Sequence, residues 1–350
     1  MIVKNEEAVL ARCLDSIADL MDEIIIVDTG STDQTKQIAY QYTDKVYDFT
    51  WCDDFAAARN FSFSKATKEY IYAPDADEYM DPENHKKFAQ IKELLLPEIE
   101  IVQMYYLTPK KNNTVQNAAR ELRPKLFKRI RTFTWIDPVH ETVRVDPVVF
   151  NSEIEIQHLP QSAHERRDFS IFEKAFLRDG RLSDRIVRMY AKELLKCGSA
   201  RDFKSAAPFF ESLYEENVTS VYASVLARHY RLQSHSFVEE GINYTDRFFS
   251  VALKDVATGG CSEVCYELGC YYLDHQNYEE AITWFYNAAY ETVPVLNIEV
   301  QGLQAPNALS ECYSCLADFC NDPKEAEQFR TLASKYYSQA HSWKLPEELE

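Results

Sequence analysis

Two short apolar runs that each lead into an aspartate constrain the fold of this chain more than any other feature. Residues 24–27 (IIIV) end at Asp28, and residues 70–73 (YIYA) lead into Asp75. Such runs suit strands that are buried on both faces, as in sheets covered by helices. Stretches with apolar residues at helical spacing flank them, at residues 8–20, 32–42 and 54–67. This alternation predicts an α/β domain with a doubly wound, mostly parallel sheet.

The pattern changes in the second half of the chain, where strand signals vanish and apolar residues keep helical spacing. Small and large residues fall at the offsets of a tetratricopeptide repeat (TPR), namely Leu268, Gly269, Tyr272, Ala281, Phe285 and Ala288. Residues 184–216 contain a weaker copy of this pattern, and residues 220–253 and 306–340 can supply further helix pairs. We therefore predict an α/β domain at residues 1–160 and an all-α, TPR-like domain at residues 161–350. An ordinary helical bundle is the alternative for the second domain.

Charge and composition argue against several classes of protein. The 350-residue chain has a formal net charge of -18, which disfavours nonspecific binding to nucleic acids or to anionic membranes. It has no long apolar run and no secretory leader, so we expect a cytoplasmic protein. The nine cysteines fit reduced core positions. Only Met1 to Val3 is left for a first strand, so either that strand is short or the natural chain starts earlier.

The segment PDADE at residues 74–78 places two carboxylates directly after a predicted strand. Asp75 and Asp77 can supply oxygen ligands to Mg²⁺ or Mn²⁺, and such a metal can neutralise charge on a leaving diphosphate. A D-x-D pattern alone is weak, because an acidic loop that caps the next helix looks the same. However, Asp28 also follows a predicted strand, and ligands of doubly wound sheets bind at the carboxyl ends of strands.

The loop after Asp28 has the composition of a ligand-binding turn. Gly30 permits a positive φ and the close approach of a ligand. Asp28 can accept hydrogen bonds from a nucleobase N–H or a ribose hydroxyl. Asp33 is better suited to cap the following helix.

Cationic residues supply a second set of candidates. Arg59 lies in DDFAAARN on a predicted helix, where it can face a base or a phosphate. An ion pair with Asp53 or Asp54 is the alternative. Residues 120–131 (RELRPKLFKRIR) alternate cationic and apolar side chains, as expected for a strand with one cationic face. That face can meet a diphosphate, or the strand is simply half-exposed.

Taken together, the segments MIVKNEE, LARCLDSI, DEIIIVDTGSTDQT, DDFAAARN and DADE resemble glycosyltransferase family 2, which comprises inverting enzymes with the GT-A fold. The resemblance is densest over residues 1–80 and is strongest to a bacterial branch that includes sublancin-type peptide S-glycosyltransferases. It implies a nucleotide-sugar donor, usually a UDP-sugar, and Mn²⁺ or Mg²⁺. The implied donor-binding residues are Val3, Lys4, Glu6, Asp28, Gly30, Arg59, Asp75 and Ala76. The implied metal ligands are Asp75, Asp77 and His140.

An inverting transfer needs a base for the acceptor's proton, unless the acceptor is already ionised, as a thiolate can be. In the bacterial branch a His-Glu pair recurs after a strand with aromatic residues, which corresponds here to His140 and Glu141. The resemblance makes His140 a metal or diphosphate ligand and Glu141 the base. Asp137 and Glu78 compete for the role of base. His158 is a further candidate to line the cleft.

The sequence therefore predicts an enzyme that transfers a sugar, most plausibly a hexose from UDP-hexose, to a peptide or protein side chain. A lipid or polysaccharide acceptor is one alternative, and a non-catalytic TPR scaffold with a degenerate transferase domain is another. The S-glycosyltransferases carry helical, repeat-like regions that assist dimerisation, so the resemblance also implies a homodimer formed through the helical domain. We expect neither nucleic acid nor an integral membrane segment among the interactions of the chain.

Overall fold

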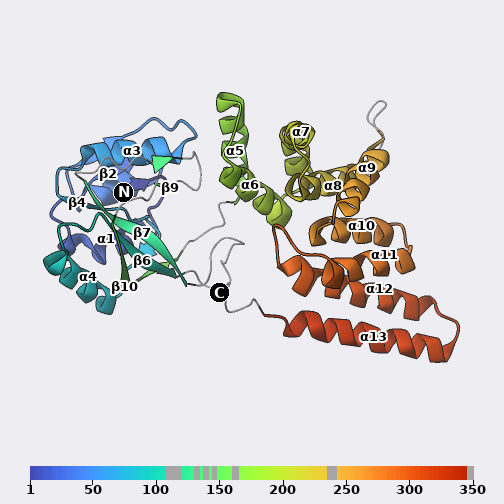
Figure 1. Ribbon diagram of the computed structural model, residues 1–350. Coiled ribbons are helices and arrows are strands. Elements are labelled where there is room, and N and C mark those ends of the chain that lie inside the picture. Colours follow the sequence, from blue (N-terminus) through green and yellow to red (C-terminus); the bar gives the residue numbers. More distant parts are fainter. Residues whose placement is uncertain are drawn as a thin grey trace. The chain divides into compact units, whose positions relative to one another are not determined.

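A computed structural model describes residues 1–107, 120–129, 135–136, 142–143, 148–159, 165–234 and 243–344. These residues form two compact units, Met1–Ile186 and Val187–Leu349. The first contains all the described strands, and the second is helical (Figure 1). The predicted order of an α/β domain followed by an all-α region is thus confirmed. The first unit extends to Ile186, so the described helical residues 165–186 fall within it.

A parallel sheet of three strands forms the beginning of the first unit. Its strands are β1 (Ile2–Val3), β2 (Ile26–Asp28) and β3 (Val46–Asp48), in that spatial order. The helices between and after these strands are α1 (Leu10–Asp15), α2 (Thr35–Ala39) and α3 (Phe55–Lys65). Ile26 and Val27 are fully buried, which confirms that the first apolar run forms a strand covered on both faces.

A mixed sheet of five strands completes the domain. Its strands, in spatial order, are β4 (Tyr70–Tyr72), β7 (Arg120–Lys128), β6 (Ile101–Leu107), β10 (Val149–His158) and β5 (Glu78–Tyr79). Only β6 and β10 run parallel, whereas the other three pairs are antiparallel. The second apolar run therefore forms a strand, as predicted, but pairs antiparallel with β7 instead of extending the parallel sheet. The short strands β8 (Trp135–Ile136) and β9 (Thr142–Val143) pair with each other.

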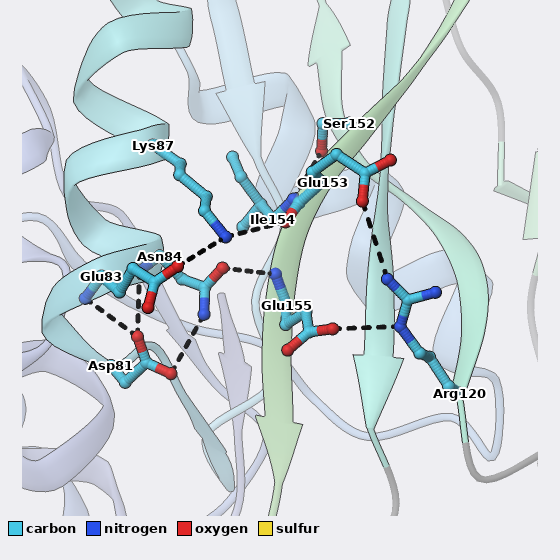
Figure 2. Close-up of polar contacts among 9 residues, drawn as sticks. All are labelled: Asp81, Glu83, Asn84, Lys87, Arg120, Ser152, Glu153, Ile154 and Glu155. Carbon is cyan, nitrogen blue, oxygen red and sulfur yellow. Dashed lines mark hydrogen bonds and ion pairs between the residues drawn. The ribbon is translucent and has the colours of Figure 1, made fainter.

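Helix α4 (Pro82–Leu94) is fixed to β10 by buried polar contacts (Figure 2). Asp81 caps the helix by accepting hydrogen bonds from the backbone N–H groups of Glu83 and Asn84. The buried Asn84 side chain donates to Asp81 at 3.0 Å, and its oxygen accepts from the N–H of Glu155 on β10 at 2.8 Å. Arg120 of β7 pairs with Glu155 from the other side. One asparagine thus joins the cap of α4 to the strand that ends at the candidate site.

The loops that follow β1 and β2 are hydrogen-bonded to each other. The backbone N–H of Asn5 donates to Ser31 Oγ at 2.9 Å, and Asn5 Oδ1 accepts from the N–H of Thr32 at 2.8 Å. Further bonds join Glu6 N–H to Thr35 Oγ1, Glu7 N–H to Asp33 Oδ2 and Gln34 N–H to the Glu7 carboxylate. Asn5 has a φ of 56°, a left-handed conformation that asparagine tolerates. The segments KNEE and GSTDQT therefore form one structural unit.

The remaining helices follow one another through the rest of the chain (Figure 1). They are α5 (Glu165–Asp179), α6 (Asp184–Cys197), α7 (Ala200–Glu216), α8 (Ser220–Ser234), α9 (Tyr244–Ala257), α10 (Ser262–Asp274), α11 (Tyr278–Tyr286), α12 (Ala305–Phe319) and α13 (Pro323–Ser342). A Cβ atom at Gly269 of α10 would lie 2.5 Å from the Phe285 ring of α11, so only glycine allows this approach. The predicted small-against-large packing of the repeat is confirmed there. No described helix is both long and apolar enough to cross a membrane.

Replacement of Asn84 by alanine should destabilise the α/β unit. Asn84→Ala removes the acceptor of the Glu155 N–H and a partner of Asp81 in a buried setting, so we expect a loss of about 1–3 kcal/mol in unfolding free energy. Chemical denaturation followed by circular dichroism measures it. Glu83→Ala, one residue earlier on the exposed side of the same turn, is the control and should change stability by less than about 0.5 kcal/mol. Equal losses for both variants would contradict the bridging role of Asn84.

Two variants of Asn5 should distinguish how much its side-chain hydrogen bond and its left-handed backbone each contribute to stability. Asn5→Gly keeps the left-handed backbone but removes the acceptor of the Thr32 N–H, so the loss should be about 1 kcal/mol. Asn5→Ala removes the same acceptor and adds strain at positive φ, for a further loss of roughly 1 kcal/mol. Hydrogen exchange of the Thr32 amide should become faster in both variants. Unchanged protection of that amide would show that the two loops do not depend on Asn5.

Candidate functional site

Asp28 shapes the turn that follows β2. Its carboxylate, only 2% exposed, accepts hydrogen bonds from the N–H of Gly30 at 3.1 Å and from that of Ser31 at 3.0 Å. Gly30 has a φ of 102°, while no atom lies within 4 Å of a Cβ added there. Backbone conformation and not lack of space therefore requires glycine. Recognition of a nucleoside by Asp28 stays a prediction, since its described partners belong to its own turn.

The other residues near this turn that are predicted to bind the sugar donor differ in how exposed they are. Val3 is buried, and its carbonyl accepts hydrogen bonds from the N–H and the hydroxyl of Thr29. Glu6 is half-buried and its carbonyl accepts from Leu10 at the start of α1. Lys4, in contrast, has an exposed side chain. Of these three predicted residues, only Lys4 is thus exposed.

The D-x-D segment is attached to the end of β10. Because β5 pairs antiparallel with β10, His158 lies opposite Glu78, and His158 Nε2 contacts Asp77 Oδ2 at 3.0 Å. The carbonyl of Asp77 accepts hydrogen bonds from the N–H of Leu159 at 3.0 Å and from the Arg12 guanidinium at 3.3 Å. Arg12 also donates to the carbonyl of Leu159. The structure therefore brings together Asp77 and His158, which are far apart in the sequence.

Asp75 is held by two cations. Arg59 Nη2 lies 3.0 Å from Oδ1 of Asp75, and Lys125 Nζ lies 3.7 Å from Oδ2. Both cations are buried, whereas 39% of the Asp75 side chain is exposed. Burial opposes ionisation of Asp75, but the charges of Lys125 and Arg59 outweigh it and hold the pKa of this carboxyl well below its usual range. Asp75 is therefore an ionised group with an open outer edge.

Arg59 and the two aspartates that were its alternative partners each have contacts of their own. Asp54 caps α3 by accepting from the Ala57 N–H at 2.9 Å, and Asp53 pairs with Lys174 at 2.9 Å. Arg59 pairs with Asp75, an acid that the sequence analysis did not name as its partner. The guanidinium carbon of Arg59 lies 4.7 Å from the Trp135 ring centroid, where it gains a cation–π contact.

Glu78 and Ala76 point into the protein. Glu78 is 1% exposed and contacts Lys125 Nζ. Burial raises the pKa of Glu78 above its usual range, whereas the charge of Lys125 opposes this rise and favours the ionised carboxylate. Burial and the contact with Lys125 argue against Glu78 as the base. Ala76 packs in the core cluster of the parallel sheet, so only its backbone is available to a donor.

The side chains at this site provide some of the ligand atoms that a divalent metal needs. Asp77 and His158 provide an oxygen and a nitrogen ligand side by side, and the buried Nδ1 of His158 has no hydrogen-bond partner among the described residues. Carboxylate oxygens suit Mn²⁺ and Mg²⁺, whereas imidazole nitrogen is more typical of Zn²⁺, Fe²⁺ or Ni²⁺. Asp75 is a poorer ligand than its sequence pattern suggested, because both its oxygens face cations. In the described residues no cluster of three or more potential ligands occurs.

Three predicted residues lie outside the described part of the chain: Asp137, His140 and Glu141. The base and the third metal ligand therefore stay predictions. Sequence reasoning missed the roles of Lys125 and Arg12. The signal for Lys125 was present in RELRPKLFK, where Arg123 and Lys125 are two residues apart and thus share one face of a strand. Both cations indeed lie near the ring of Tyr106, at 4.0 Å and 5.1 Å from its centroid.

Sequence comparisons identify the first domain. Residues 1–143 match the family described as Glycosyl transferase family 2. A TPR repeat-containing protein of Synechococcus elongatus is 47% identical over 78 residues, which cover 22% of this chain and 19% of that protein. The SPbeta prophage-derived glycosyltransferase SunS of Bacillus subtilis is 38% identical over 97 residues, or 27% of this chain and 23% of that protein. The chain thus spans less than a quarter of the length of these two relatives.

A comparison of structures finds glucosyl-3-phosphoglycerate synthase from Mycobacterium tuberculosis. It is 16% identical, the TM-score is 0.40, and the match covers 52% of this chain and 79% of that one. No residue role can be transferred at this level of similarity. The sequence match over residues 1–143 thus identifies a glycosyltransferase family 2 domain in the N-terminal region of this chain.

Proposed function

We propose that this protein is an inverting glycosyltransferase that takes a sugar from a nucleoside-diphosphate sugar, namely UDP-hexose. The observation that carries the proposal is the contact of Asp77 with His158 beside the ionised Asp75, at one edge of a family 2 domain. The interlocked loops after β1 and β2 supply a preformed surface for the nucleotide. A preformed surface lowers the entropy that binding costs.

Asp77 and His158 would hold Mn²⁺ or Mg²⁺, with His140 as a predicted further ligand. When bound, the metal supplies positive charge that stabilises the departing diphosphate. Asp75 presents its open carboxylate edge to the donor, and the loop at Gly30 allows the nucleotide to come close. Lys4 is free to meet a phosphate or a ribose. The acceptor atom then attacks the anomeric carbon as the bond to the diphosphate oxygen breaks, which inverts the configuration.

The acceptor's proton is the remaining requirement of this reaction. Glu141 is the proposed base and Asp137 the competing one, both from the segment that follows β8. If the acceptor is a thiolate, no base is needed. The activity profile against pH with thiol and hydroxyl acceptors would distinguish these cases, because only the hydroxyl reaction depends on the ionised carboxylate.

We further propose that the two domains have different roles. Residues 1–160 bind the sugar donor and carry out the transfer, and residues 161–350 bind the acceptor. Repeats of helix pairs create extended surfaces that suit peptide segments, which favours a peptide or protein acceptor. Large apolar side chains are exposed in this part, including Val293, Phe319 and Tyr337. Such residues also fit the proposed homodimer.

The donor reaction should be detectable without the natural acceptor. Purified protein with UDP-hexose and Mn²⁺ should release UDP slowly by transfer to water, and EDTA should suppress the release because the diphosphate then lacks its counter-charge. A coupled UDP assay over several UDP- and GDP-sugars measures it, with boiled protein as control. Absence of both UDP release and nucleotide binding for all common donors would favour the scaffold alternative.

Asp77 should be required for metal-dependent donor binding. We expect Asp77→Asn to weaken UDP binding in the presence of Mn²⁺ by roughly 10–100-fold, equivalent to about 1.4–2.8 kcal/mol, because the amide is a much poorer ligand. Binding without metal should change little. Titration calorimetry with UDP, with and without Mn²⁺, gives both affinities. Glu83→Gln, an exposed acid on the next helix, is the matched control. Unchanged affinity in Asp77→Asn would refute the metal assignment.

A further inference from the structure

The cationic strand β7 contains one lysine whose burial is not explained by the reaction. Lys125 is 5% exposed, and an unpaired ammonium group is costly to remove from water. Its Nζ contacts the carboxylate of Glu78 and lies 3.7 Å from Asp75 Oδ2. The ring of Tyr106 covers another side, with its centroid 5.1 Å from Nζ. Lys125 is thus enclosed between two acids and an aromatic ring behind the D-x-D segment.

The geometry of Asp75 depends on two cations that act on different oxygens. Arg59 engages Oδ1, and Lys125 faces Oδ2. Arg59 is itself placed against Trp135. Because each oxygen has its own cation, rotation of the carboxylate would weaken both contacts. Its exposed edge is therefore presented in one orientation.

The main chain of Lys125 also holds the segment that delivers Asp75. β4 and β7 pair antiparallel, with Tyr72 opposite Leu126. Immediately beyond that pair, the N–H of Ala73 donates to the carbonyl of Lys125 at 2.8 Å. The same residue thus fixes the path of the chain into PDADE through its backbone and the direction of the Asp75 carboxylate through its side chain.

We propose that Lys125 is a positioning residue for donor binding, which orients the carboxylate of Asp75, and that Glu78 serves as its buried counter-charge. This inference rests on the proposed function, because it assumes that the open edge of Asp75 meets the nucleotide sugar. Loss of Lys125 should then weaken donor binding, and the chemical step should change less, since the interaction is present before the transition state.

A purely structural pair of Lys125 and Glu78 makes a different prediction. Lys125→Met leaves Glu78 buried without a counter-charge and should lower the melting temperature. The double variant Glu78→Gln with Lys125→Met removes both charges and should recover much of that loss. If the pair only serves stability, donor binding should recover as well. If Lys125 positions Asp75, donor binding should stay weak in a stable protein.

The experiment compares the wild type, Lys125→Met, Lys125→Arg and the double variant as full-length chains. Melting temperature, UDP affinity with Mn²⁺, and KM and kcat for UDP release from UDP-hexose are measured for each. In the double variant we expect KM to rise about tenfold or more while kcat changes less than about threefold. Lys125→Arg keeps a cation near Asp75 and should stay within about threefold of the wild type in KM. Lys128→Met, on the exposed end of the same strand, is the control and should leave both constants unchanged.

The outcomes separate this inference from the proposed function. A double variant with wild-type KM and wild-type UDP affinity would overturn the positioning role while leaving the glycosyltransferase intact. Equal losses of kcat and kcat/KM, with KM unchanged, would also overturn it, because they would place Lys125 in the transition state. A wild-type protein that neither binds UDP nor releases it from any donor would refute the proposed function, and the inference with it.

Discussion

The candidate site depends on the antiparallel pairing of two residues of β5 with the end of β10. This register sets His158 opposite Glu78, and so places Asp77 against His158. A shift by one residue would turn these side chains to opposite faces of the sheet. Arg12 reinforces the same register, because its guanidinium bridges the carbonyl groups of Asp77 and Leu159. The two proposed metal ligands are thus held by backbone geometry.

Burial of charge follows from the same arrangement. The pairing of β5 turns Glu78 into the core, where a carboxylate needs a counter-charge, and Lys125 of β7 provides it. Lys125 in turn faces Asp75, which Arg59 holds from the other side. Buried ion pairs add little net stability compared with apolar side chains of similar volume. Their presence beside the proposed donor edge is therefore better explained by the orientation that they impose on Asp75 than by stability.

Local patterns in the sequence predicted the elements but not their partners. The strand at residues 26–28, the glycine at Gly30 and the close packing at Gly269 could be predicted, because each depends on residues near it in the chain. The antiparallel pairing of β4 could not, since periodicity gives no strand order. The same limit applies to the site. The D-x-D pattern could be recognised in the sequence, but its contacts with His158 and Lys125 could not, because they join segments that only the sheet brings together.

In the proposed reaction, the residues that bind the nucleotide and those that activate the acceptor lie in different parts of the sequence. The proposed nucleotide-binding residues lie on loops that directly follow strands and that hydrogen-bond to each other. These residues are therefore close together in the sequence, between Lys4 and Asp77. Ordering such loops in advance reduces the cost of binding, and it also restricts their sequence. The proposed bases, Asp137 and Glu141, come later in the sequence and lie outside the residues that the structure describes. The local motifs of the loops therefore predict a nucleotide-sugar enzyme more readily than its sugar or its acceptor.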